Sequence, residues 1–189
     1  MAVDFPDHSF WDFSLEVYGR DGVPPACLEL QEAHGVDVNV ILFCCWLGRT
    51  GRGRLDGAET AAMCDAVAQW HEVVVRGVRG VRQRLKAGVP GAPLELSEPL
   101  RRRLAAIEVQ LEHIEQLMLA GSVDRAADEA RAEADRLADA VANTRGYFDR
   151  FGAAASPADA ASFAVILGSV FPDAPHAAVA QAAGELAAR

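Results

Sequence analysis

Apolar residues recur every three or four positions over most of this chain, which is the spacing that places them on one face of an α-helix. No segment alternates apolar and polar residues as a half-buried strand does. Glycine and proline interrupt the pattern where helices are expected to begin or end. The pattern predicts an all-α protein, with helices over about residues 7–18, 24–34, 38–47, 57–70, 73–86, 98–120, 123–148, 156–171 and 175–187.

The most regular part of this pattern lies between residues 97 and 152. Apolar residues from Leu100 to Met118 are spaced alternately by four and three positions, and the same spacing continues from Val123 to Phe148. Glycine and serine between the two runs suit a tight turn. Two heptad runs joined by a turn predict a long antiparallel helical hairpin within a multi-helix bundle. In that hairpin, bulky residues of one helix would pack on the alanines of the other.

The same boundaries predict how the chain is organised. We expect one helical domain over residues 1–152, made of a core of short helices (7–96) and the long hairpin (97–152). The segment 38–47 is apolar on nearly all sides of a helix, so it is expected at the centre of the core. Residues 153–189 are rich in alanine and predict C-terminal helices that are either docked on the bundle or loosely attached.

Composition excludes several classes of protein. Hydrophobic residues make up 51% of the 189 residues, enough for a sizeable core and too many for a wholly disordered chain. The net charge of −9 argues against nucleic-acid binding, and the longest apolar run, Val40–Leu47, is far short of the ~20 residues of a membrane span. Four cysteines without a C-x-x-C motif, and the lack of a signal-peptide pattern, predict a cytoplasmic protein with no membrane span.

Charge is distributed unevenly along the chain. Residues 49–103 contain 11 Lys and Arg against 6 Asp and Glu, whereas the segments on either side are acidic. Arg76, Arg79, Arg82 and Lys86 form a candidate basic stripe along one expected helix. Such a stripe suits an anionic ligand or an acidic protein partner. The alternative, which the acidic excess of the chain favours, is a surface that pairs with the protein's own acidic helices.

Four polar residues, Asp12, Gln31, Asp37 and Asn39, lie among apolar neighbours in or beside the first three expected helices. Because an unpaired buried amide costs about 1–3 kcal/mol, Asn39 and Gln31 need hydrogen-bond partners wherever they are buried. In the structural interpretation, which we favour, Asp37 caps the third helix and the amides tie helix ends together. The functional alternative is a polar pocket between these three helices.

Other motifs do not indicate catalysis. The glycine-rich segment 48–53 lacks the Lys-Ser/Thr pair of a phosphate loop, so we interpret it as a linker. His71 and Glu72 are not followed by a second histidine at position 75, and the five histidines are far apart in the sequence. The zinc-protease pattern is therefore absent. We predict no catalytic residue, no metal site and no cofactor.

Several motifs between residues 10 and 120 occur at fixed spacing. They are Phe-Trp-x-Phe-Ser-Leu at 10–15, Leu-x-Leu-Gln at 28–31, Asp-Val-Asn at 37–39 and Leu-Phe-Cys-x-Trp-Leu at 42–47, followed by Trp70, Val74, Val75, Arg79, Arg82, Leu85 and Lys86. In these motifs the chain resembles an uncharacterised family of small, mainly proteobacterial proteins recorded as a domain of unknown function. The resemblance implies a bacterial, cytoplasmic and helical protein, and it brings no activity, cofactor or partner. Gly77 stands where the family usually has proline, so a fixed kink at this point is not expected.

The function is therefore unknown from the sequence, and two hypotheses stay open. The favoured one is a non-enzymatic cytoplasmic protein that binds a protein partner, or a second copy of itself, through the hairpin or the basic stripe. The alternative is a small-molecule-binding protein or enzyme, with an anionic ligand held in the polar pocket near Arg79 or Arg82.

Overall fold

The structure is a computed structural model that describes residues 4–188 and is all-helical over that range, as the sequence predicts. No helix among the described residues is long and apolar enough to cross a membrane. The elements in chain order are α1 (Ser9–Tyr18), α2 (Val23–His34), α3 (Val38–Arg49), α4 (Gly57–Gln69), the π-helical turn η1 (Trp70–Val75), α5 (Arg76–Ala87), α6 (Leu94–Ser122), α7 (Glu133–Phe151), the 3-10 turn η2 (Pro157–Asp159), α8 (Ala160–Val170) and α9 (His176–Ala187).

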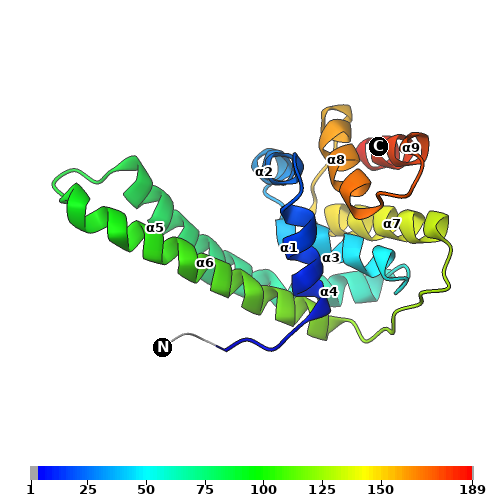
Figure 1. The fold of residues 1–189 in the computed structure, drawn as a ribbon, viewed down its shortest axis with the longest axis horizontal. Helices are drawn as coiled ribbons and strands as arrows, with labels where there is room; N and C mark the ends of the chain where they lie inside the picture. The colour runs from blue at the N-terminus through cyan, green and yellow to red at the C-terminus, as the bar shows by residue number, and fades with distance from the viewer. Residues whose placement is uncertain (1–3, 189) are drawn as a thin grey trace.

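α3 lies in the middle of the body, as predicted for the most apolar segment (Figure 1). Every residue from Asn39 to Gly48 is buried. α7 packs along α3 so closely that a Cβ atom on Gly48 would lie 2.6 Å from the backbone nitrogen of Ala140. Glycine at this position therefore permits the helix contact around which the core is built.

The last two helices pack against the body. α8 contacts α2 and α3, and α9 contacts α8 and α7. The apolar face of α8 that includes Phe163, Ile166 and Leu167 is buried in the core. Alanines of α9, such as Ala182 and Ala183, let this helix approach its neighbours closely.

A long antiparallel hairpin is present, but it pairs different helices from those that the sequence predicts. α4, η1 and α5 follow one another without a break, and α6 runs back along them (Figure 1). After α6, residues 123–132 form no helix and lead the chain to α7, which packs on α3. The prediction that residues 97–152 form the hairpin, closed by a tight turn, is therefore wrong.

The physical reason is that heptad spacing specifies an apolar face and not the helix that covers it. On α7 the predicted face is buried, with Leu137, Val141 and Phe148 in the core, but its neighbour is α3. Ala127 and Ala134, which were expected to pack on α6, are exposed. α3 offers α7 a far more apolar surface than α6 does, so burial of apolar area favours the contact that is observed.

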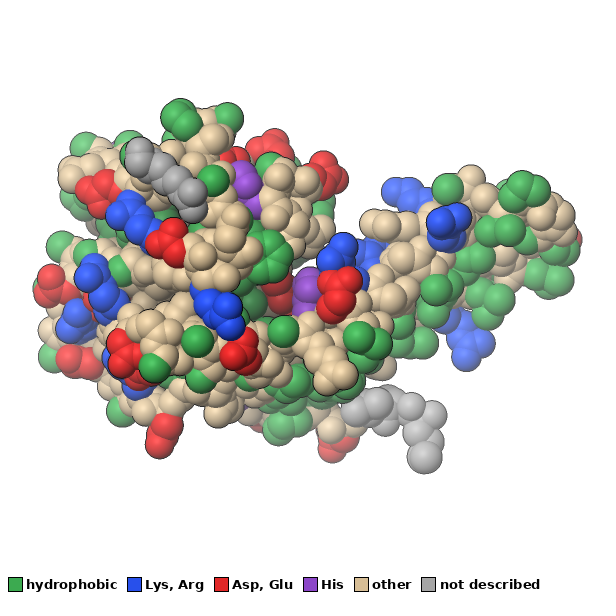
Figure 2. Space-filling model, turned by 180° about the vertical axis from the view of Figure 1, so that it is seen from behind, with side chains coloured by type: hydrophobic (Ala, Val, Ile, Leu, Met, Phe, Trp, Pro, Cys, Tyr) green, Lys and Arg blue, Asp and Glu red, His purple; other side chains and the backbone are tan. Residues whose placement is uncertain are grey.

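The hairpin extends well beyond the body as an arm, which we define as residues 76–107 (Figures 1 and 2). No side chain of α5 is buried, and α6 has no buried residue before Glu108. Apart from the base of the arm, where Arg79 reaches Gln31 of α2, its two helices are supported by each other within residues 4–188.

Candidate functional site

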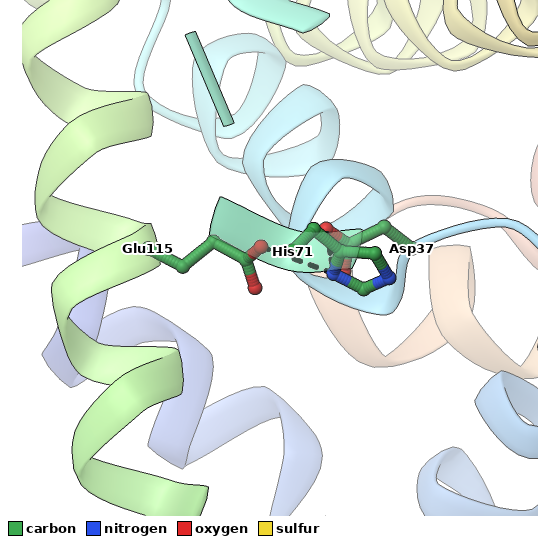
Figure 3. A group of neighbouring side chains, drawn as sticks. All are labelled: Asp37, His71 and Glu115. Carbon is green, nitrogen blue, oxygen red and sulfur yellow. Dashed lines mark hydrogen bonds and ion pairs between the residues drawn. The ribbon is translucent and has the colours of Figure 1, made fainter. Parts of the chain in front are cut away.

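Three ionisable side chains from distant parts of the chain meet where the arm joins the body (Figure 3). Nδ1 of His71 lies 3.0 Å from Oδ2 of Asp37 and 3.0 Å from Oε1 of Glu115. The Glu115 residue is 0% exposed and Asp37 is 6% exposed. We call these residues the carboxylate–histidine cluster.

Local structure explains how each member of the cluster is placed. Asp37 is the N-cap of α3, as the sequence predicts, and its Oδ1 accepts a hydrogen bond from the backbone N–H of Asn39 at 2.8 Å. Its own backbone N–H donates to the Tyr147 hydroxyl at 2.7 Å. His71 lies in the π-helical turn η1, an irregularity that recurs at functional sites in proteins. Glu115 comes from the buried face of α6.

Two amides, one on α3 and one on α6, form a hydrogen-bonded chain that ends on the cluster. Nδ2 of Asn39 donates to Oε2 of Glu115 at 2.7 Å, and Nε2 of Gln116 donates to Oδ1 of Asn39 at 2.8 Å. The buried position of Asn39 and its need for partners agree with the expectation from the sequence. Among the described residues, Oε1 of Gln116 and Oδ2 of Asp37 are buried without a hydrogen-bond partner.

The cluster brings ionisable groups together in a part of the structure that is largely buried from water. Burial lowers the pKa of His71, but its contacts with Asp37 and Glu115 outweigh burial and raise that pKa to about 10. Burial also raises the pKa of Glu115, and its contacts with His71 and Asn39 oppose this only in part. Two carboxylates thus compete for one imidazole N–H group, which can serve only one of them well.

A second charged group lies next to the cluster, at the base of the arm. Nε of Arg79 donates to Glu108 at 2.7 Å, and its two terminal nitrogens donate to Glu112 at 2.6 Å and to Gln31 at 3.1 Å. Arg82 also bonds Glu108 through its guanidinium. Glu108 and Glu112 lie on the side of α6 that faces α5, so these ion pairs hold the two helices of the hairpin together.

The structure separates the four residues of the candidate basic stripe. Arg79 and Arg82 are engaged with acidic residues of α6, and Arg76 pairs with Glu72 one turn earlier at 2.6 Å. Of these four residues, Lys86 alone is exposed and forms no ion pair with another described residue. The stripe is therefore mostly neutralised by the protein's own carboxylates, which was the alternative that the charge balance favoured.

The four candidate pocket residues are also divided. Gln31, Asp37 and Asn39 line a cavity of about 370 Å³ between α1, α2, α3 and the base of the hairpin. Asp12 does not line this cavity, because it lies on the exposed side of α1. The prediction that Asp12 lies in apolar surroundings is therefore wrong. α1 is covered on one side only, so the side that carries Asp12 faces solvent. A second cavity, of about 350 Å³, is lined by Asp37, His71 and Tyr147.

His71, Glu115 and Gln116 are the site residues that sequence reasoning missed. A partial signal was present, because Glu108, Glu112 and Glu115 recur at the spacing of one helix face. The heptad assignment placed that face outside the apolar seam and therefore in solvent. Opposite charges on α5 and the polar end of α3 make it a buried face instead.

Comparison with known proteins gives one match. The model of a family described as a protein of unknown function (DUF2390) matches residues 9–119. No curated protein and no solved structure matches the chain. The matched region begins at α1 and ends within α6, so it contains every residue of the carboxylate–histidine cluster.

Proposed function

The chain belongs to the DUF2390 family of proteins of unknown function, and from that starting point we propose that it binds a helix of a partner protein through its arm. The observation that carries the proposal is a row of large, exposed apolar side chains on α6 that no described part of the chain covers. Leu96, Leu100 and Ile107 are 66%, 52% and 41% exposed. We call these three residues the heptad row.

The spacing of the heptad row favours a helix as its occupant. Its members are four and seven positions apart, so they lie on one face of α6 and continue the heptad pattern of the lower half of that helix. α7, which the sequence pattern offered as the covering helix, packs on α3 instead. A lipid surface needs no such register, whereas a helix that packs knobs into holes does.

Charge favours an acidic partner over a second copy of the arm. The arm contains eight Lys and Arg and only two Asp and Glu, and three further carboxylates beside its base neutralise part of this excess. Within the part of the chain that the structure describes, Arg84, Lys86 and Arg103 are exposed and form no ion pair. Two arms brought together would repel each other, so we infer that the partner helix carries Asp or Glu beside its apolar face. The proposal includes a cytoplasmic location, which the four free cysteines support.

Site-specific photo-crosslinking tests the proposal in the cell. A crosslinking amino acid at position 100 of the heptad row is compared with one at position 165, where Val165 is exposed on α8 in the body. We expect a discrete protein adduct from position 100 only, and a crosslinked peptide that forms an acidic amphipathic helix. Substitution of Leu100→Ser together with Ile107→Ser should weaken binding of that purified segment by about tenfold or more.

Other outcomes would count against the proposal. An adduct with a second copy of this chain, adducts with lipid alone, equal yields from both positions, or no adduct at position 100 would each remove its support. Flotation with anionic vesicles separates the membrane alternative, because the chain is expected to stay unbound without its protein partner.

A second candidate function is binding of a small polar molecule in the cavity that Gln31 and Asn39 line. The unpaired Oε1 of Gln116, which lines the same cavity, favours it. A thermal-shift screen of metabolites tests this function, since a ligand at 100 times its Kd adds about 2.7 kcal/mol of stability. A hit that Gln116→Ala abolishes would support the function, and a screen without hits would oppose it.

A further inference from the structure

The carboxylate–histidine cluster has the composition of a metal site. We propose that Asp37, His71 and Glu115 bind one divalent transition-metal ion of the kind represented by Zn²⁺ and Mn²⁺. One imidazole nitrogen with two carboxylate oxygens suits these ions, whereas Mg²⁺ and Ca²⁺ prefer oxygen ligands alone. This site is separate from the arm, so its test does not depend on the proposed partner.

The distances within the cluster are those of ligands that share an ion. Two ligands that are each about 2.1 Å from one ion lie about 3.0–3.4 Å apart in octahedral or tetrahedral geometry. Nδ1 of His71 lies 3.0 Å from the nearest oxygen of each carboxylate. The three ligand atoms all lie within 4.8 Å of one another. Small side-chain rotations are enough to bring all three atoms to one ion without a change of the backbone.

The balance of charge also points to a dication. Asp37 and Glu115 bring two negative charges into a place where neither is exposed to more than a trace of solvent. Buried carboxylates are costly unless they are paired. The Nδ1 atom of His71 forms its hydrogen bond with Glu115, and within the described residues Oδ2 of Asp37 has only the 3.0 Å ion-pair contact with the same nitrogen. A dication that replaces the Nδ1 proton of His71 and binds one oxygen of each carboxylate satisfies both groups at once, and the displaced proton is released to solvent.

The other oxygen of each carboxylate, which does not face His71, is already engaged in a hydrogen bond. Asn39 binds Oδ1 of Asp37 through its backbone N–H and Oε2 of Glu115 through its side chain. This leaves Oδ2 and Oε1, the two oxygens that face His71. Hydrogen bonds of this kind orient the ligands in metal sites.

An independent observation comes from Gln116, which is 4% exposed. Its Oε1 is a buried acceptor without a partner among residues 4–188, and it lines the same cavity as Asp37. A buried acceptor of this kind requires a donor such as an ordered water molecule. Three protein ligands leave coordination positions for water, and the second cavity, which Asp37 and His71 line, gives solvent a route to them.

The chain contains a matched control for this inference. Nε2 of His34 lies 3.0 Å from Oδ2 of Asp159, the same distance as in the cluster. In the described part of the chain, however, His34 meets one carboxylate only, and Oδ2 of that carboxylate also accepts a hydrogen bond from the backbone of Ser156 at 2.7 Å. We therefore expect the cluster to bind an ion and the His34–Asp159 pair not to.

The test uses the full chain, stripped of metal by a chelator that is then removed. Zn²⁺, Mn²⁺ and Mg²⁺ are titrated separately by calorimetry, and Co²⁺ is used as a spectroscopic probe. We expect one Zn²⁺ or Co²⁺ per chain, a visible Co²⁺ absorption band, a higher melting temperature with Zn²⁺, and much weaker binding of Mg²⁺. Glu115→Gln and His71→Gln should each lower the affinity by about 100-fold or more. His34→Gln should leave it unchanged.

Each alternative result has a clear meaning. Wild-type protein that binds neither Zn²⁺ nor Co²⁺ at one ion per chain overturns the proposal, whatever the variants do. Binding that survives Glu115→Gln, or that His34→Gln weakens equally, also overturns it. Circular dichroism of each metal-free variant shows whether it is folded, and Asp37→Asn replaces any variant that is not.

Discussion

Asn39 donates a hydrogen bond of 2.7 Å to Glu115, 76 positions further along the chain. This bond ties the first turn of α3, in the middle of the core, to the buried face of α6 at the base of the arm. The same amide accepts from Gln116, so one side chain connects the body, the hairpin and the candidate metal site.

Loss of this amide should destabilise the protein strongly. We expect Asn39→Ala to lower the free energy of unfolding by about 2–4 kcal/mol, because it leaves a buried carboxylate and a buried amide without their partner. Asp12→Ala is the control, since Asp12 is exposed, and it should change stability by less than about 0.5 kcal/mol. Urea unfolding of both variants measures the difference. Equal effects would contradict the assignment of Asn39 as the connecting residue.

Arg79 should be worth far more to stability than the exposed arginines of the arm that form no ion pair among the described residues. Arg79→Ala leaves Glu108 and Glu112 without their shared partner near the base of the hairpin, and we expect a loss of about 2–3 kcal/mol. Arg84→Ala removes an exposed side chain without an ion pair among the described residues and should cost less than about 0.5 kcal/mol. A double-mutant cycle with Glu108→Gln gives the coupling energy of the pair directly. A coupling energy near zero would show that the two side chains do not interact in solution.

The surroundings of Gly48 in α3 and Gly80 in α5 lead to opposite predictions for the two glycines. A Cβ atom on Gly48 would lie 2.6 Å from backbone atoms of α7, so Gly48→Ala should cost about 1–3 kcal/mol by forcing the helices apart. A Cβ atom on Gly80 would meet nothing within 4 Å in the described chain, so Gly80→Ala should stabilise α5 by about 0.5–1 kcal/mol. Thermal melting of both variants tests the pair. A stabilising Gly48→Ala would mean that α3 and α7 are further apart than the structure has them.

Glu108 should make the hairpin sensitive to acid. Burial raises the pKa of Glu108, but its contacts with Arg82 and Arg79 outweigh burial and hold that pKa below its ordinary value. A carboxyl group of this kind stabilises the folded state fully above its unfolded pKa, about 4.3, and the contribution is lost as the pH falls through the lower folded value.

The measurement is the difference in unfolding free energy between the wild type and Glu108→Gln. We expect a large difference at pH 6 that shrinks as the pH is lowered below about 4. Burial raises the pKa of Glu112, so the contribution of Glu112 to stability changes with pH in the opposite direction. Glu112 is present in both proteins, so this contribution largely cancels from the difference. A difference that stays constant with pH would show that Arg79 and Arg82 do not lower the pKa of Glu108.

Much of the fold followed from local patterns. Helix periodicity predicts the all-α class, and the run from Val40 to Leu47 predicts the centre of the core, which α3 occupies. Asp37 before an apolar helix predicts the N-cap that is observed. The burial of Asn39 follows from the aromatic residues that share its face of α3. These features depend on neighbours within one or two turns, so the sequence alone is sufficient for them.

The pairing of helices and the composition of the site depended on tertiary structure. Heptad spacing on α6 and α7 specifies an apolar face for each, but only the assembled body decides that α3 covers one and that part of the other stays open. Asp37, His71 and Glu115 are separated by 34 and 44 positions, and no local pattern links them. Periodicity is a property of single helices, whereas a site requires side chains of several helices to point to one place, and their packing alone determines that.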